Sequence, residues 1–484
     1  MLNTSKKFEY IALCAIIIIG VAIRFHGLGE KGLWNDEILI ARAVREPTVK
    51  GMLYDVWEMF GSTPVLPLIE RILPQGPHPE FWARFPSAVS GTIAVWVIFL
   101  LGRRLSGPAA GLGAALLLAV NPLHVYFSQH ARFYSLLTTL AMVQLITLMR
   151  ATEIPAGRRW VVFFALTSLC FYSGYYTLFL LLGEALALLF ASYMLPWRKS
   201  FRSFGGPFLL AITGAFIAFL PWFIRHSSRN IFAMFGPPPG FLRPVIATVQ
   251  EFGPIDPMTY PLIYKAQGLP DIGPLLFLLL ATIGMARAVL RRDLKGWLLV
   301  VPLLITIPSI VAFETWITSF FYRPKQVIFI LPLYLIAISS AIFLLCGYFR
   351  RLRRPATLAV FMALTFLSGL AVQSYARREE HQGFRPAARY LMEHRRDGEP
   401  VGIHQAYYEP VFRFYYRAGA IPLDSMEKAR SIAERGGWFV TVMEHTDDPE
   451  VGEYIYRSQE QVAAWQPDPE YPEIRIYRGR GGKK

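Results

Sequence analysis

The stretch "QVIFILPLYLIAISSAIFLLCG", Gln326–Gly347, contains no charged residue. It is long enough to cross the roughly 30 Å of hydrocarbon in a bilayer as one helix, and blocks of about 18–22 mainly apolar residues like it recur along the chain. The 484 residues are 54% hydrophobic and only 17% charged, whereas soluble proteins carry about 25% charged residues. The sequence therefore predicts an all-α polytopic membrane protein.

Hydropathy predicts about eleven spans. Every second connection between them is short and contains Lys or Arg, such as Arg103–Arg104 or Arg350–Arg354. Short basic connections face the cytoplasm, so we expect a multi-pass protein of the inner (plasma) membrane with a cytoplasmic N-terminus and an extracytoplasmic, periplasmic C-terminus. The net charge of +15 is then a topology signal, and we expect no nucleic-acid partner. The predicted spans lie near residues 8–28, 84–102, 108–126, 131–149, 160–178, 180–196, 206–225, 272–290, 296–313, 326–347 and 355–374.

The two ends of the chain give further predictions about its domains. The first apolar block follows "MLNTSKKFEY" without a small-residue cleavage site and is expected to be a retained anchor. Residues 1–374 form the predicted transmembrane domain, with large outer segments at 29–83 and 226–271. Residues 375–484 are richer in charged residues and predict a small soluble α/β domain, with a helix at Phe384–Arg396 and strands at Gly437–Met443 and Glu473–Gly479.

Three cysteines, Cys14, Cys170 and Cys346, all lie inside apolar blocks. Such cysteines act mainly as small packing residues, so no disulfide framework and no metal site is predicted from them.

The first outer segment contains "GLWNDEILIARAV", Gly32–Val44, with adjacent carboxylates at Asp36 and Glu37. A local explanation is that Asn35 or Asp36 caps a helix whose apolar side faces lipid. A functional explanation is that one carboxylate takes a proton from an attacking hydroxyl.

Two further outer segments favour the functional explanation. "NPLHVYFSQHARFYSLL", Asn121–Leu137, contains Arg132, and "ETWITSFFYRPKQ", Glu314–Gln326, contains Arg323 and Lys325. Each cation alone is also explained by snorkelling to lipid phosphates. Cations and a carboxylate pair on one predicted face of the bundle together suit a reaction on a lipid phosphate, because guanidinium groups bind phosphate oxygens in a bidentate fork.

These segments, with "LWNDE", "FWARFPSAVSG", "YRPKQVIFILPLYL" and the tail stretch "GFRPAARYLMEH", resemble the GT-C integral-membrane glycosyltransferases. The most similar group is that of protein O-mannosyltransferases and bacterial lipid A aminoarabinose transferases. The resemblance implies an inverting enzyme that moves a sugar from a polyprenyl-phosphate carrier to a hydroxyl of an acceptor lipid, glycan or protein at the outer membrane surface. We expect no cofactor and no metal, because cations can stabilise the leaving phosphate and a carboxylate can act as the base.

The resemblance also implies roles for individual residues. The first-loop aspartate matches the catalytic base or acceptor-orienting carboxylate of the family. The acid after it and the tyrosine of the arginine motif are expected at the acceptor or sugar site, and the basic residues at the donor phosphate. The catalytic residue is thus Asp36, the acceptor or sugar site holds Glu37 and Tyr134, and the donor phosphate is bound by Arg132, Arg323 and Lys325.

The chain departs from many bacterial members at two places. It has "STPVLPL", Ser62–Leu68, where they have His-Pro-Pro, and His130 where they have an acid. The spacing of His78, His124 and His130 fits no ligand signature, so surface or hydrogen-bonding roles are expected for them.

Two other classes of function remain open. A lipid-linked-substrate transporter or flippase would carry ionisable residues inside its spans, and Glu184 in "LLGEALALL" is one. A membrane scaffold would bind a partner through its outer tail, for example through the Tyr-rich segment Tyr407–Tyr416.

Overall fold

The computed structural model contains the whole chain. The segments that it does not describe include Arg323 and almost all of the second outer segment. The described residues are all except 1–3, 60–62, 155, 195–197, 228–271 (apart from 245, 248, 252 and 253), 314–323, 350, 377–381, 443–448, 466–472 and 481–484.

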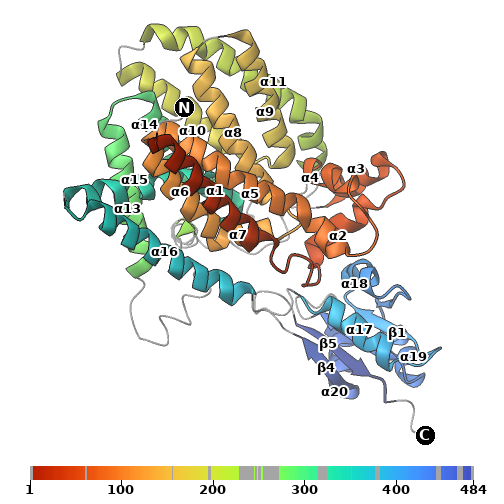
Figure 1. The fold of residues 1–484 in the computed structure, drawn as a ribbon. Coiled ribbons are helices and arrows are strands. Elements are labelled where there is room, and N and C mark those ends of the chain that lie inside the picture. Colours follow the sequence, from red (N-terminus) through yellow and green to blue (C-terminus); the bar gives the residue numbers. More distant parts are fainter. Residues whose placement is uncertain are drawn as a thin grey trace. The chain divides into compact units, whose positions relative to one another are not determined.

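Each predicted span coincides with a helix or a helix pair (Figure 1). The boundary between the predicted spans at 160–178 and 180–196 lies a few residues earlier in the structure, because one helix ends at Ser173 and the next begins at Thr177. The helices are α1 Thr4–Phe25, α5 Pro79–Ser106, α6 Pro108–Val120, α7 Pro122–Ser128, α8 Tyr134–Glu153, α9 Gly157–Ser173, α10 Thr177–Met194, α11 Arg198–Ser227, α13 Ile272–Leu290, α14 Leu294–Phe313, η4 Pro324–Ile330 with α15 Leu331–Tyr348, and α16 Arg353–Ala376.

Seven of the described helices are long and apolar enough to cross a membrane, and the bent pair α6–α7 would be an eighth. Helices α10 and α13 contribute shorter apolar segments, Thr177–Tyr193 and Leu275–Leu290. The protein is therefore a multi-pass membrane protein, while the number eleven remains a prediction.

The bend of 60° between α6 and α7 follows from local sequence. Asn121 interrupts the helix in an extended conformation, and its side-chain oxygen accepts the His124 N–H at 2.9 Å. Pro122 begins the new helix, where its missing N–H costs nothing.

Small residues allow close helix packing in the bundle. Helix α10 packs against α14 at Gly183, where an added Cβ would lie 2.6 Å from the Pro302 Cα. Helix α13 packs against α15 at Gly284, next to the Ala337 carbonyl. A larger side chain at either position would separate the helices.

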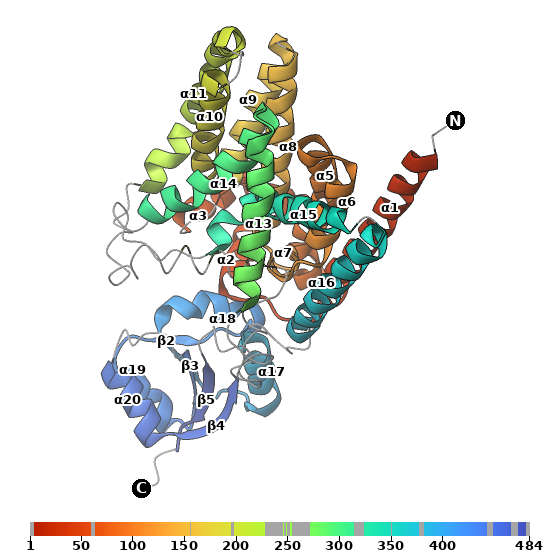
Figure 2. The same ribbon diagram turned by 90° about the vertical axis from the view of Figure 1, so that its left-hand side faces the viewer.

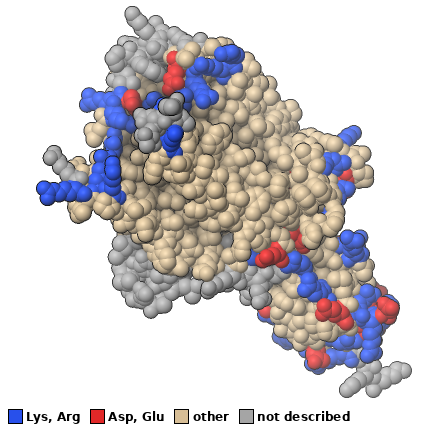
Figure 3. Space-filling model, viewed as in Figure 1, with Lys and Arg blue, Asp and Glu red and all other residues tan. Residues whose placement is uncertain are grey.

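Connections that are predicted to lie on the same side of the membrane contact one another. Among the predicted outer ones, Thr63 Oγ1 donates to the Ser173 carbonyl at 2.9 Å, and Gln326 Nε2 donates to Tyr176 Oη at 3.1 Å. Among the predicted inner ones, Arg104 pairs with Glu153 at 3.1 Å. The space-filling view shows a broad bundle face without charges, with Lys and Arg gathered at its margin (Figure 3).

The tail forms a five-stranded sheet in the order β2-β1-β3-β5-β4. Strands β1 and β2, and β1 and β3, are parallel, whereas β3–β5 and β4–β5 are antiparallel. The predicted helix and both predicted strands are confirmed as α17, β3 and β5. The elements are α17 Phe384–His394, β1 Val401–His404, η5 Ala406–Tyr408, α18 Glu409–Tyr415, β2 Ile421–Leu423, α19 Met426–Glu434, β3 Trp438–Val442, α20 Pro449–Ser458, β4 Glu460–Trp465 and β5 Ile474–Arg478.

Helices cover both faces of this sheet, with α17 on one side and α19 and α20 on the other (Figure 2). Successive side chains of a strand point to opposite faces. Phe439 of β3 accordingly packs with Ile432 of α19 and Ile455 of α20, whereas Trp438 contacts Tyr390 of α17. The tail is thus a three-layer α/β domain with two small cores.

Contacts divide the chain into two compact units. The first consists of Met1–His26, Leu53–Ile72 and Arg84–Tyr375, and therefore contains the helix bundle. The second consists of Gly27–Met52, Leu73–Ala83 and Ala376–Lys484. Most of the first outer segment, including helix α2 (Asn35–Val44), thus packs with the tail. Helices α3 (Val49–Glu58) and α4 (Val65–Arg71) follow α2 along that segment.

Candidate active site

The acidic pair lies in the first turn of α2. The residue that caps this helix is Trp34, so neither Asn35 nor Asp36 is the cap that the local explanation required. Glu37 Oε2 accepts the Trp34 N–H at 3.1 Å, and Glu37 is completely buried, whereas Asp36 is partly exposed. Glu37 therefore holds the start of the helix, and Asp36 is the carboxylate with access to solvent.

The apolar side of α2 is buried, with Ile38 and Ala43 inaccessible. It packs against α18 of the tail. Arg45, at the end of α2, lies 4.6 Å from the centre of the Phe414 ring. Burial and the charge of Arg417 lower the pKa of Arg45, and the charge of Glu80 acts in the opposite direction. The helix side that was expected to face lipid thus packs against protein.

Two backbone N–H groups around the first residue of α2 donate hydrogen bonds to tail side chains. The Leu33 N–H donates to Tyr415 Oη at 2.7 Å, and the Asn35 N–H donates to Gln382 Oε1 at 2.8 Å. Tyr415 in turn donates to Glu80 Oε1 at 3.2 Å, and Glu80 pairs with Arg385 at 3.6 Å. The segment that leads to Asp36 is therefore fixed from both sides by hydrogen bonds.

Two of the predicted phosphate ligands, Arg132 and Lys325, lie in the other unit, around the ring of Tyr134. Arg132 Cζ lies 6.0 Å and Lys325 Nζ 5.8 Å from the centre of this ring. Cations at such distances interact favourably with an aromatic face. Arg132 and Tyr134 are nearly buried, and Lys325 is partly buried. Two cations far apart in the chain thus lie next to one aromatic ring.

Neighbouring side chains hold this cationic group in place. Ser87 Oγ donates to the Arg132 carbonyl at 3.0 Å, and Ser135 Oγ donates to the Ser87 carbonyl at 2.9 Å, which ties α5 to the start of α8. The Tyr134 ring also packs against Phe127 at 4.6 Å. The described part of the predicted phosphate site is therefore rigidly supported, whereas Arg323 lies outside the described residues.

The comparisons with known proteins agree with the motifs. The family model described as dolichyl-phosphate-mannose-protein mannosyltransferase matches residues 67–224. The apo structure of ArnT from Cupriavidus metallidurans matches at 14% identity over 100% of both chains, with a TM-score of 0.61. The same protein bound to undecaprenyl phosphate matches at 14% identity with a TM-score of 0.57 and covers 97% of this chain and 99% of its own. This chain has the GT-C fold.

A second solved protein is also similar to this chain. AglB from Archaeoglobus fulgidus, an archaeal oligosaccharyltransferase in complex with an inhibitory peptide and a dolichol-phosphate, matches at 12% identity with a TM-score of 0.56. The match covers 99% of this chain and 75% of that one. No curated protein matches the sequence significantly. The resemblance to GT-C proteins that the motifs indicated is confirmed.

The sequence analysis missed Arg24, which supports the GT-C bundle from inside. It is completely buried in α1, where it donates to the Leu118 and Ala119 carbonyls at 3.1 and 2.9 Å and contacts His124 Nδ1 at 2.9 Å. These groups surround the bend between α6 and α7, where helix carbonyls lack partners within the helix. An arginine inside an apolar block is the signal that could have revealed it.

The three histidines behave largely as expected. His124 and His130 are buried and hydrogen-bonded, and His130 Nδ1 lies 2.6 Å from the Tyr126 carbonyl, while His78 is exposed. Within the described part of the chain, no three His, Cys, Asp or Glu side chains are grouped as a metal site.

Glu184 has a partner across helices. Gln144 Nε2 of α8 donates to Glu184 Oε2 at 2.9 Å in the buried interior. The buried carboxylate of Glu184 is thus hydrogen-bonded to a side chain of another helix.

Proposed function

We propose that this protein is an inverting glycosyltransferase that transfers a sugar from a polyprenyl-phosphate carrier to an acceptor hydroxyl at the extracytoplasmic surface of the inner membrane. The observation that carries the proposal is the pair of cations, Arg132 and Lys325, beside Tyr134. Among the similar structures, ArnT is bound to undecaprenyl phosphate and AglB is in complex with a dolichol-phosphate. Lipid phosphate is the ligand that this cationic group suits.

In this mechanism Arg132 and Lys325 bind the donor phosphate, and Arg323 is expected to assist them. A guanidinium has five N–H donors and an ammonium three, so both groups can bind several phosphate oxygens. The bond between the sugar C1 and the phosphate oxygen breaks, and the phosphate leaves with both negative charges. Cations fixed in a site that largely excludes water stabilise this charge as it develops.

Asp36 acts as the general base for the acceptor. The acceptor oxygen attacks C1 from the side opposite the phosphate while its proton passes to the carboxylate, so one displacement inverts the configuration. General-base help of this kind contributes about 10²–10⁴-fold. The Glu37 carboxylate positions Asp36 by capping α2, and Tyr134 lines the sugar or phosphate site. No metal takes part in this scheme.

The experiment uses the full-length protein in proteoliposomes and separates binding from transfer. Binding of labelled undecaprenyl phosphate reports on the cations, and release of sugar from a set of radiolabelled polyprenyl-phosphate sugars reports on transfer. We expect Asp36→Asn to lower turnover by about 10²–10⁴-fold with unchanged undecaprenyl phosphate affinity. Glu46→Gln, a carboxylate beyond the other end of α2, is the matched control and should keep full turnover.

Arg132→Ala is expected to weaken undecaprenyl phosphate binding by about tenfold or more, since hydrogen bonds to charged groups contribute about 1.5–3 kcal/mol. Arg132→Lys should restore only part of this loss, because an ammonium cannot form the bidentate fork. Equal binding by Arg132→Ala and Arg132→Lys would contradict bidentate phosphate contact, and full turnover in Asp36→Asn would contradict the base assignment.

The same assay tests the other classes of function. A flippase would move the labelled donor across the bilayer without consuming it, and a scaffold would leave it untouched. The tail gives less support to the scaffold than its sequence suggested, because Tyr408, Tyr415 and Tyr416 contact other residues of this chain.

A further inference from the structure

A cavity of about 410 Å³ lies where the end of α8 meets the start of α9 and the end of α5. Four arginines line it, together with one carboxylate, that of Glu153. The arginines come from three helices: Arg104 from α5, Arg150 from α8, and Arg158 and Arg159 from α9. The cavity therefore carries an excess of positive charge.

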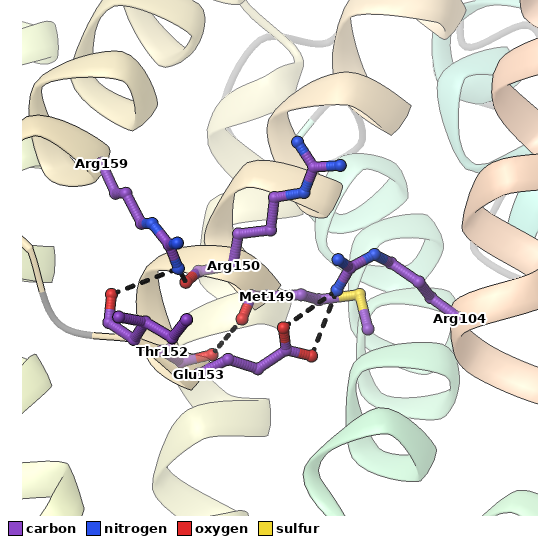
Figure 4. A network of polar contacts seen from close by, with 7 residues as sticks. Arg104, Met149, Arg150, Thr152, Glu153 and Arg159 are labelled. Atoms are coloured by element: carbon purple, nitrogen blue, oxygen red, sulfur yellow. Dashed lines mark hydrogen bonds and ion pairs between the residues drawn. The ribbon is translucent and has the colours of Figure 1, made fainter.

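Two of these arginines already have partners that hold the cavity walls together (Figure 4). Arg104 Nη1 donates to both oxygens of Glu153 at 3.1 Å, which joins α5 to α8. Arg159 Nη1 donates to the Arg150 carbonyl at 2.7 Å, which joins the start of α9 to the end of α8. The carboxylate of Glu153 thus forms its ion pair with Arg104.

The other two arginines differ from these. The guanidinium of Arg150 extends away from the network in Figure 4, and both Arg150 and Arg158 are exposed. Within the part of the chain that the structure describes, neither guanidinium forms an ion pair with a carboxylate. They are the groups in this cavity with capacity for an external anion.

Exposed apolar side chains continue the cavity along the bundle surface. Val162 lines the cavity and is 50% exposed, and Val161 beside it is 65% exposed. In a membrane protein such side chains face lipid acyl chains. A basic cavity that opens onto an apolar helix surface matches a molecule with an anionic head and an apolar tail.

We propose that this cavity binds the phosphate of an anionic phospholipid headgroup, with Arg150 and Arg158 on the phosphate and the acyl chains along Val161 and Val162. Basic pockets between helices on the cytoplasmic side bind such headgroups, and the positive-inside pattern places these arginines on that side. A topology signal needs only basic residues in a connection, whereas here they surround a cavity.

The site is separate from the proposed donor site. Arg132 precedes the first residue of α8, and Arg150 lies in its last turn. At 1.5 Å per residue these ends are about 25–30 Å apart. The lipid site thus lies at the membrane surface opposite to the proposed chemistry, and its test is independent of that chemistry.

The test compares full-length wild type, Arg150→Gln/Arg158→Gln and the control Arg353→Gln/Arg354→Gln. The control removes the same charge from the exposed start of α16, outside the cavity. Native mass spectrometry from nanodiscs counts retained phosphatidylglycerol against phosphatidylcholine, and thermal unfolding is followed with each lipid. Inorganic phosphate in detergent forms a separate arm.

We expect wild type and control to retain phosphatidylglycerol selectively, and the cavity variant to bind it about tenfold or more weakly. Equal loss in the cavity variant and the control would overturn the proposal, because a diffuse charge effect would explain it. Equal retention in all three proteins would also overturn it. Stabilisation by inorganic phosphate to the same extent as by lipid would overturn the lipid as the source of the phosphate.

Discussion

Replacing Tyr415 with Phe removes one hydroxyl that links the tail to the segment before Asp36. This hydroxyl accepts the Leu33 N–H at 2.7 Å and donates to Glu80 Oε1 at 3.2 Å. The Leu33 residue is completely buried and Glu80 is 8% exposed. Water therefore has little access to replace either bond, while the Phe ring keeps the packing.

The magnitude follows from the two groups that lose a partner. A buried N–H without a partner costs about 1–3 kcal/mol, and a hydrogen bond to a carboxylate contributes about 1.5–3 kcal/mol. Glu80 keeps its ion pair with Arg385 at 3.6 Å, which reduces the second loss. We expect local opening of the segment to become easier by about 2–4 kcal/mol, which is roughly 30- to 900-fold in the opening equilibrium.

Hydrogen–deuterium exchange of the full-length protein in nanodiscs measures this opening through peptides that cover residues 28–44. Tyr407→Phe is the matched control, because its hydroxyl accepts a longer bond, of 3.4 Å, from the partly exposed Asn35 side chain rather than from a buried backbone N–H. The control should change exchange by less than about threefold, since exposed bonds contribute little. Unchanged exchange in Tyr415→Phe, or an equal change in both variants, would refute the anchoring role of the hydroxyl.

Two further predictions concern pH and metal. Burial acts to raise the pKa of Glu399, but the hydrogen bonds from Trp438 Nε1 and the Arg396 N–H and the charge of Arg478 outweigh it and lower that pKa. The carboxylate therefore stabilises the tail above the pKa of the unfolded state, and this stability is lost as the pH falls through the folded-state pKa. Glu399→Gln should weaken exchange protection of β3 by about 2 kcal/mol at pH 7, and by less below about pH 4; an equal difference at both values would contradict this. EDTA should leave donor turnover unchanged because fixed cations supply the charge at the phosphate, and a loss that one divalent metal restores would show otherwise.

The sequence predicted the positions of helices well because hydropathy and breaking residues act locally. The break at Ser173–Thr177 depends on residues that are adjacent in the chain. The bend at Asn121–Pro122 also has a local cause, although the predicted span at 108–126 did not include it. The number of spans does not follow in the same way. Helix α9 has 17 residues and the apolar part of α10 is equally short, so their length alone does not show whether each crosses the bilayer.

Local sequence rules could not predict which residues contact α2. The amphipathic pattern of Asn35–Val44 predicts that one side is buried, but lipid and protein bury it equally well. Its contact with Phe414 and its hydrogen bond to Gln382 join residues hundreds of positions apart. Glu37 illustrates the same limit, since an acid in a first turn suits both a cap and a binding site, and only the geometry shows the cap.

Helix α8 shows why the charge pattern alone could not separate the two cationic sites. Arg132 lies just before its start, beside the Tyr134 ring, and Arg150 lies in its last turn, beside a cavity with one carboxylate. Both arginines satisfy the same rule that cations lie at membrane edges. Arg132 is nearly buried, and Ser87 Oγ donates to its carbonyl. A cation fixed in this way favours charge stabilisation in a reaction. At the end the guanidinium stays exposed, which favours exchangeable lipid binding. The surroundings of each arginine, set by residues distant in sequence, thus assign different chemistry to equal charges.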